Sequence, residues 1–264
     1  MSSISLITLL PVLAFILFLI LQTLQPRRVS AKNGFSVNWR NRSLHNYLLF
    51  LINSILFRLI VPLTLIATSV FSNTHQLGLA NWYTLDSWWW IIFCVVVLDL
   101  AIYWQHVATH KLDFLWRFHK VHHADTHMDV TTALRFHPIE LLLSLFYKSL
   151  LVLILGAPVI AVVIFELLLF IGPAFNHSNW RMPLYIDKVV RVFIVTPDMH
   201  RAHHSIYKTE QDTNYGFLLS CWDQLFKTYT ESPKDGHLAM KIGLNDHKEG
   251  DTVSLYRMLT MPFK

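Results

Sequence analysis

The sequence predicts an all-α membrane protein with about three spanning helices and a helical hairpin, capped by a cytosolic helical domain rich in histidine. Two observations favour this fold class. Of the 264 residues, 53% are hydrophobic and 15% are charged, a composition that suits neither a soluble domain nor a disordered chain. The chain also holds 15 histidines, and eight of them lie in three short motifs.

Three apolar runs are long enough for the predicted spans. The first, from about Ile4 to Leu24, is unbroken and covers the roughly 30 Å hydrocarbon layer at ~1.5 Å per residue. The second, Tyr47 to Phe71, is interrupted by Arg58. The third, Trp88 to about Trp104, opens with three tryptophans that are typical of a membrane interface. We therefore expect three helices, of which the first is an uncleaved anchor.

A fourth apolar region, Glu140 to Pro173, is predicted to form the hairpin. Gly156, Ala157 and Pro158 form a turn that divides it into arms too short to span as separate vertical helices, so both ends are expected on one side. Lys148 and Glu166 are nearly equidistant from this turn, and antiparallel arms would pair them. A lone charge in the bilayer costs roughly 3 kcal/mol or more, which favours an ion pair. The alternative is that Lys148 extends to an interface.

Basic residues predict the orientation. Five Lys or Arg lie between Gln25 and His45 and 16 lie after residue 105, whereas none lies between Ser72 and Ser87. By the positive-inside rule, the N-terminus and the 72–87 loop are external and the histidine motifs are cytosolic, in a bacterial inner membrane or the endoplasmic reticulum. These positions explain the net charge of +5 better than a nucleic acid does, so no nucleic-acid partner is expected.

The three histidine motifs are HVATH at 106–110, HKVHH at 119–123 and HRAHH at 200–204. Residues at i, i+3 and i+4 share one helix face, so each motif can direct imidazoles at one centre. A single such motif is more often a packing feature, but the combination is specific. HExxH is absent, and up to eight imidazoles exceed what one tetrahedral zinc needs. Two irons fit best, and a bis-histidine haem is the alternative.

Several polar residues are candidates to orient these imidazoles from outside. Asp99, Tyr103, His106 and His110 lie on one helical stripe, so Asp99 and Tyr103 are candidates, although Asp99 would equally neutralise Arg58. Other candidates are Asn176, Asp125, Asp129, Asp198 and Asp223, of which the aspartates also suit helix caps or the surface. The TNYG stretch at 213–216 and the following SCWDQLF predict a turn and a helix that pack over the site.

Together these segments resemble the fatty acid hydroxylase and sterol desaturase superfamily of integral-membrane di-iron enzymes. The resemblance is carried, in order, by DLAIYWQHVATH, LWRFHKVHHAD, TALRFHPIE, TPDMHRAHHS and TNYGFLLSCWDQLF, from about Asp99 to Thr230. The sequence has no long internal repeat, low-complexity segment or Pro/Gly linker, so we expect a single domain over 1–264, with its histidine-rich core at about 99–230. The metal ligands that the resemblance implies are His106, His110, His119, His122, His123, His200, His203 and His204, joined by His177 in FNHSNW and, as a weaker candidate, by His137 in RFHPIE.

The resemblance also implies a reaction. Two iron ions and O2 would hydroxylate or desaturate a lipid such as a sterol or a fatty acyl chain. The electrons would come from a separate cytochrome b5-like, ferredoxin-like or reductase-like partner. Two other classes stay open, namely a non-enzymatic membrane carrier of metal or haem electrons and a zinc-dependent lipid hydrolase.

Overall fold

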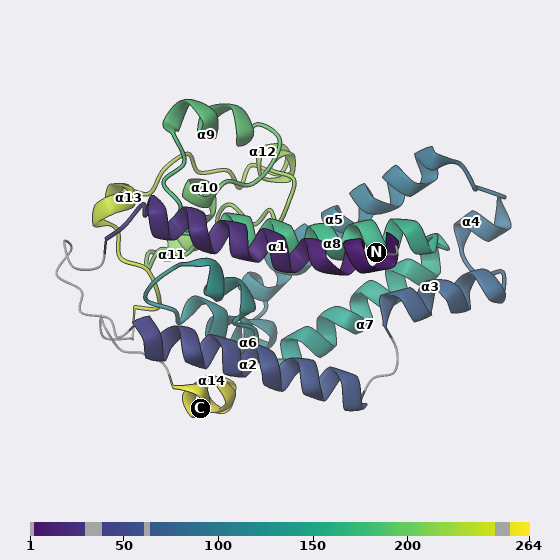
Figure 1. Cartoon of the computed structure of the whole chain (residues 1–264), viewed down its shortest axis with the longest axis horizontal. Coiled ribbons are helices and arrows are strands. Elements are labelled where there is room, and N and C mark those ends of the chain that lie inside the picture. Colours follow the sequence, from purple (N-terminus) through teal and green to yellow (C-terminus); the bar gives the residue numbers. More distant parts are fainter. Residues whose placement is uncertain (1–2, 30–38, 61–63, 246–253) are drawn as a thin grey trace.

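The computed structural model describes residues 3–29, 39–60, 64–245 and 254–264. Over these residues every regular element is a helix, and only isolated β-bridges, such as the one between Ile194 and Leu219, join the loops. The long helices extend along the molecule, and most of the short helices gather at one end (Figure 1). The predicted all-α class is confirmed, whereas the side of the membrane that this end faces stays a prediction.

Three helices are long and apolar enough to cross a membrane: α5 (Trp88–Lys111), α7 (Pro138–Leu155) and α8 (Val159–Asn176). They share a core of buried side chains that includes Leu98, Val152 and Phe165. The predicted first span forms α1 (Ser3–Leu24), which packs along α8. Because α5 continues past Trp104, the end of the predicted third span, His106 and His110 lie on its last two turns.

The second apolar run forms two helices instead of one span. α2 (Trp39–Ile60) is followed by α3 (Leu65–Thr74), and residues 61–63 between them lie outside the described residues. This stretch of sequence contains Pro62, which has no amide hydrogen for a helix interior. The prediction of one helix from Tyr47 to Phe71 is therefore wrong.

The predicted hairpin is present, but its arms are longer than expected and diverge. α7 ends at Gly156, whose φ of 62° is left-handed, and α8 begins after Pro158. Each arm has 18 residues, or roughly 27 Å at ~1.5 Å per residue, so each is long enough to cross a membrane. Figure 1 shows the two arms separating as they leave the turn.

The divergence explains why the predicted Lys148–Glu166 ion pair does not form. Both residues belong to the described part of the chain, and no ion pair or hydrogen bond joins them there. Instead, they line the same cavity between α7 and α8. The two charges interact electrostatically across this cavity, but the predicted direct ion pair is absent because the two arms are held apart at this level.

The turn of the hairpin is closed by backbone contact with the loop before α4 (Leu79–Trp82). A Cβ on Gly78 would lie 2.7 Å from the Gly156 Cα and still closer to the Leu153 carbonyl oxygen. Gly78 also has a left-handed φ of 86°, which glycine adopts without strain. Glycine therefore permits the close approach that fixes this apex.

The remaining elements form the histidine-rich cap at the open end of the hairpin. α2 is joined to the cap by buried Arg42, which pairs with Asp125 at 2.6 Å and also with Asp129. The cap elements are α6 (Asp113–His123), η2 (Val130–Leu134), α9 (Leu184–Val190), α10 (Pro197–His203), α11 (Lys208–Gln211), α12 (Cys221–Leu225), α13 (Gly236–Ala239), α14 (Leu255–Thr260) and η3 (Met261–Phe263).

Candidate metal centre

Nine buried histidines gather in two adjacent groups at the junction of the cap with α5 and α8. Within each group, one ring nitrogen from every residue lies within 4.8 Å of the others. The first group comprises His106, His110, His119, His123 and His203. The second comprises His122, His177, His200 and His204. All nine were expected as ligands from the sequence. The fold brings the distant segments that carry them together.

The two HxxHH motifs are divided between the groups in complementary ways. α6 directs its first and last histidines, His119 and His123, to the first group and His122 to the second. The motif that begins on α10 does the reverse, since His203 joins the first group while the other two join the second. Each motif therefore bridges both groups, which holds them side by side.

Backbone carbonyls fix the orientation of three of the imidazoles. A carbonyl oxygen only accepts hydrogen bonds, so each contacted Nδ1 must carry the hydrogen, and Nε2 is left with a lone pair. The three pairs are His106 Nδ1 with the Tyr215 oxygen at 2.7 Å, His203 Nδ1 with the Thr213 oxygen at 2.7 Å, and His177 Nδ1 with the Pro173 oxygen at 2.8 Å.

The Nε2 atoms face one another at distances that suit shared ions. His106 and His119 bring their Nε2 atoms to 3.2 Å, and His177 Nε2 lies 3.0 Å from His122 Nε2 and 3.1 Å from His200 Nε2. Nitrogens bound at about 2.1 Å and at right angles to one ion are about 3.0 Å apart. The spacing is that of ligands around a common centre.

Among the described residues, several buried ring nitrogens have no hydrogen-bond partner, including both nitrogens of His123 and His204. Each such atom costs about 1–3 kcal/mol unless something else satisfies it. Burial lowers the pKa of His203 to about 3 and that of His177 to about 4, so both rings are neutral at pH 7. Neutral, buried imidazoles with free lone pairs are what a bound transition metal requires.

Glu140 is a functional residue that sequence reasoning missed. Its buried carboxylate, in the first turn of α7, accepts a hydrogen bond from His119 Nδ1 at 2.6 Å. Carboxylates that contact a metal-bound imidazole in this way hold the ring and raise its basicity. The sequence does show an acidic residue just after RFHP, at the start of an apolar helix. It does not show that this residue contacts His119, which lies 21 residues earlier in the chain.

The expected outer residues act on a loop and not on the imidazoles. Asp99, Tyr103 and Asn176 each fasten the 213–228 segment, and Asp99 does not pair with Arg58 either. No hydrogen bond between these three side chains and an imidazole occurs in the part of the chain that the structure describes. The contacts are Asp99 Oδ2 with Trp222 Nε1 at 2.8 Å, Tyr103 OH with Thr228 Oγ1 at 2.8 Å, and Asn176 Nδ2 with the Phe217 oxygen at 2.9 Å.

The four further aspartates likewise have partners other than the imidazoles of the two groups. Asp223 accepts from the backbone amides of Tyr215 at 2.7 Å and Gly216 at 2.8 Å, so it shapes the loop that contacts His106. The other three form ion pairs with arginines, namely Asp125 and Asp129 with Arg42, and Asp198 with Arg27 and Arg201. The predicted packing of the TNYG loop over the site is present, since its Thr213 and Tyr215 carbonyls accept from the site.

His137 lies outside both groups. It caps the start of α7, where its Nδ1 accepts from the Ile139 amide at 3.2 Å, and its Nε2 lies 3.3 Å from the Leu259 oxygen. Both ring nitrogens are thus engaged away from the centre. The structure thus places His137 as a helix cap, and its weaker candidacy as a ligand stays a prediction.

Comparison with known proteins gives matches in the same region. The family model described as fatty acid hydroxylase matches residues 91–228. An ornithine lipid hydroxylase of Rhizobium tropici is 33% identical over 145 residues, which are 54% of this chain and 43% of that protein. An alkylglycerol monooxygenase of Danio rerio is 32% identical over 170 residues, 62% of this chain and 35% of the relative.

A third relative, the cholesterol 25-hydroxylase of Rattus norvegicus, is 24% identical over 149 residues, 56% of this chain and 49% of that protein. The matched region spans less than half the length of each of these three relatives. No solved structure matches the chain.

Proposed function

We propose, from the premise that this chain belongs to the fatty acid hydroxylase family, that it is a membrane-bound oxygenase that hydroxylates or desaturates a lipid with O2 at two iron ions. The observation that carries the proposal is the pair of buried histidine groups. They contain five and four residues, and within each group one ring nitrogen from every residue lies within 4.8 Å of the others. The named relatives, which act on an ornithine lipid, an alkylglycerol and cholesterol, support a lipid substrate.

The donor set fits two ions better than the alternatives. Tetrahedral structural zinc takes four ligands, whereas the first group offers five. A haem needs two axial histidines and space for its ring, but here the imidazoles pack at centroid distances such as 4.4 Å for His177 and His200. When bound, two irons would supply the electron chemistry that allows O2 to attack a C–H bond.

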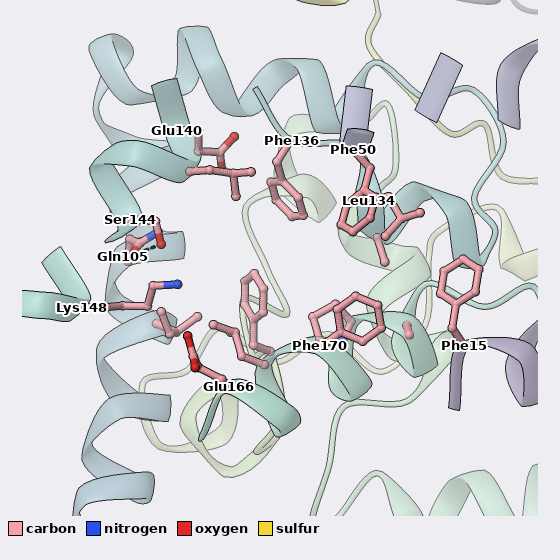
Figure 2. Close-up of a pocket in the computed structure, with 17 residues that line it drawn as sticks. Phe15, Phe50, Gln105, Leu134, Phe136, Glu140, Ser144, Lys148, Glu166 and Phe170 are labelled. Carbon is pink, nitrogen blue, oxygen red and sulfur yellow. Dashed lines mark hydrogen bonds between the residues drawn. The ribbon is translucent and has the colours of Figure 1, made fainter. Parts of the chain in front are cut away.

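The residues around the groups would exclude water and hold the imidazoles. His119 is kept in position by Glu140, while the 213–216 loop fixes His106 and His203. A cavity of about 270 Å³, lined mostly by apolar side chains, borders the groups (Figure 2). In it, Phe136 stacks on His122 at 4.5 Å, so a lipid chain in this cavity would lie beside the second group.

Orientation and electron supply belong to the same proposal. The excess of Lys and Arg on the segments that flank the histidines supports a cytosolic site. Two electrons for each turnover would come from a separate carrier of the cytochrome b5, ferredoxin or reductase type.

Metal analysis and lipid analysis together test the proposal. We expect purified protein to hold about two iron ions per chain. Cells that express it should contain lipids heavier by one oxygen or lighter by two hydrogens, with the added oxygen labelled by 18O2. Zinc with product formation in the absence of O2 would instead indicate a hydrolase, and a Soret band would indicate a haem carrier.

A further inference from the structure

The cavity between α7 and α8 follows one stripe of each helix. On α7, Glu140, Ser144 and Lys148 line it at intervals of four residues, so they lie on one face. The stripe on α8 consists of Glu166, Leu169, Phe170, Pro173 and Ala174. The cavity therefore runs along both diverging arms of the hairpin.

Its two ends differ in chemistry. At the histidine end, Glu140 accepts from His119, and Phe217 lies 5.2 Å from His106 between ring centroids. About two turns farther along α7 towards the apex, Lys148 and, from α8, Glu166 line the cavity, and we call this part the charged end. Eight residues separate Lys148 from Glu140, which corresponds to about 12 Å along the helix.

At the charged end the two opposite charges act on each other electrostatically, but they do not touch. Figure 2 shows Lys148 and Glu166 pointing into the same space from different arms. Within the described residues, neither side chain makes a direct hydrogen bond or ion pair, so their polar atoms have room for a further partner between them. Because the apex and the packing of the arms keep the two groups apart, a bound polar group would complete the hydrogen bonding of both.

The charges define which polar group fits. An ammonium donates hydrogen bonds and a carboxylate accepts them, so a bridging group must do both. The two charges sum to zero, so a ligand with net charge would leave one of them unmatched, and a zwitterion would bring two more charges out of water. A hydroxyl accepts from Lys148 and donates to Glu166 without adding charge, whereas an ether can only accept.

We propose that the charged end binds the hydroxyl of a lipid and so sets which carbon reaches the histidine groups. The inference rests on the proposed function, because it names the substrate class of that oxygenase. With the hydroxyl between Lys148 and Glu166, a carbon roughly 12 Å away lies beside Glu140. The substrate is then a hydroxylated lipid that enters with its hydroxyl away from the metal centre.

Binding to the detergent-solubilised holoprotein, without O2 or reductant, tests the proposal. A fluorescent fatty acyl probe is displaced by hexadecanol or by its methyl ether. We expect hexadecanol to bind on the order of tenfold tighter, because the ether cannot donate to Glu166. Glu166→Leu should reduce this preference to nearly none, because it removes the acceptor that only the alcohol can use. Lys148→Met removes a donor that either oxygen can accept from, so it should weaken both ligands and keep the preference, while Lys148→Arg, which keeps a donor, should retain the affinity for both.

Leu169→Ala, on the same stripe of α8, is the matched control and should weaken both ligands equally. Iron content of each variant shows that the fold is kept. Equal affinity of the wild type for alcohol and ether would overturn the proposal, as would a Glu166→Leu variant that weakens both ligands in parallel. A protein that prefers the alcohol but never oxidises a lipid would contradict the proposed function alone.

Discussion

The two histidine groups differ in how firmly the protein holds them. In the first group, three of five imidazoles have an Nδ1 partner within 2.7 Å, supplied by Tyr215, Thr213 and Glu140. In the second, the described residues supply a hydrogen bond from outside the group to His177 alone, at the Pro173 carbonyl. The first group is thus arranged before any ion binds, whereas the second depends more on the ion itself.

The difference has its origin in the surrounding segments. Among the imidazoles, the 213–216 loop contacts those of the first group. Asp223 fastens that loop to α12, and Asp99 fastens α12 in turn to α5 through Trp222. Burial raises the pKa of Asp223 to about 6, although its three hydrogen bonds favour the ionised form. We therefore expect the first site to bind its ion more tightly, and four perturbations test this asymmetry.

The largest effect is expected from His203→Ala. This change removes a ligand from the preorganised group and leaves the carbonyl of Thr213 without its donor. Activity should fall by on the order of 100-fold or more, and iron by about half or more. Iron analysis and product formation measure both. His45→Ala, on α2 and outside both groups, is the control, and an equal loss there would refute the assignment of the site.

Glu140→Ala should selectively weaken the first group. Losing the carboxylate frees His119 to rotate, so the affinity for one ion should drop by about 10–100-fold. Glu140→Gln should lose less, because its amide oxygen still accepts from Nδ1. Chelator competition that resolves two classes of iron would show which site changes. Equal weakening of both classes would show that the two groups are not independently held.

Acidification should destabilise the metal-free protein. Burial lowers the pKa of His177 to about 4, whereas an unfolded histidine titrates near 6.5. Between these values the unfolded chain binds the proton and the folded chain does not, so stability falls as pH drops from about 6.5 towards 4. Each pH unit costs up to about 1.4 kcal/mol for this residue. Denaturant unfolding at several pH values measures it, and constant stability would contradict it.

The smallest effect is expected from His137→Ala. Removing the cap of α7 should reduce the free energy of unfolding by about 0.5–2 kcal/mol and leave iron content unchanged. His137→Asn, which can cap the same helix, should restore most of the loss. Loss of iron in either variant would place His137 in the metal centre after all.

The histidine motifs were legible in the sequence because the helical period alone places i, i+3 and i+4 on one face. The sequence did not show that each HxxHH motif is divided between two groups, because this division depends on how α6, α10 and α5 cross. Glu140 was missed for the same reason: its partner His119 belongs to another helix.

Longer-range geometry also explains the wrong predictions. The Lys148–Glu166 pair assumed parallel-sided arms, but their angle is set by packing at Gly78 and Gly156. The single span over Tyr47 to Phe71 followed from hydropathy, which does not register the break between α2 and α3 near Pro62. Apolar character predicts that a segment is buried in lipid, but not the shape of the helices it forms.

The two arms of the hairpin diverge from a single close contact, that of Gly78 with Gly156 at the apex. A methyl group on Gly78 would press on the Gly156 backbone, and a small tilt there would be magnified with distance along α7 and α8. The width of the cavity between the arms is thus governed at the end of the molecule farthest from the imidazoles. A change at the apex can therefore alter that cavity without touching any of the nine histidines.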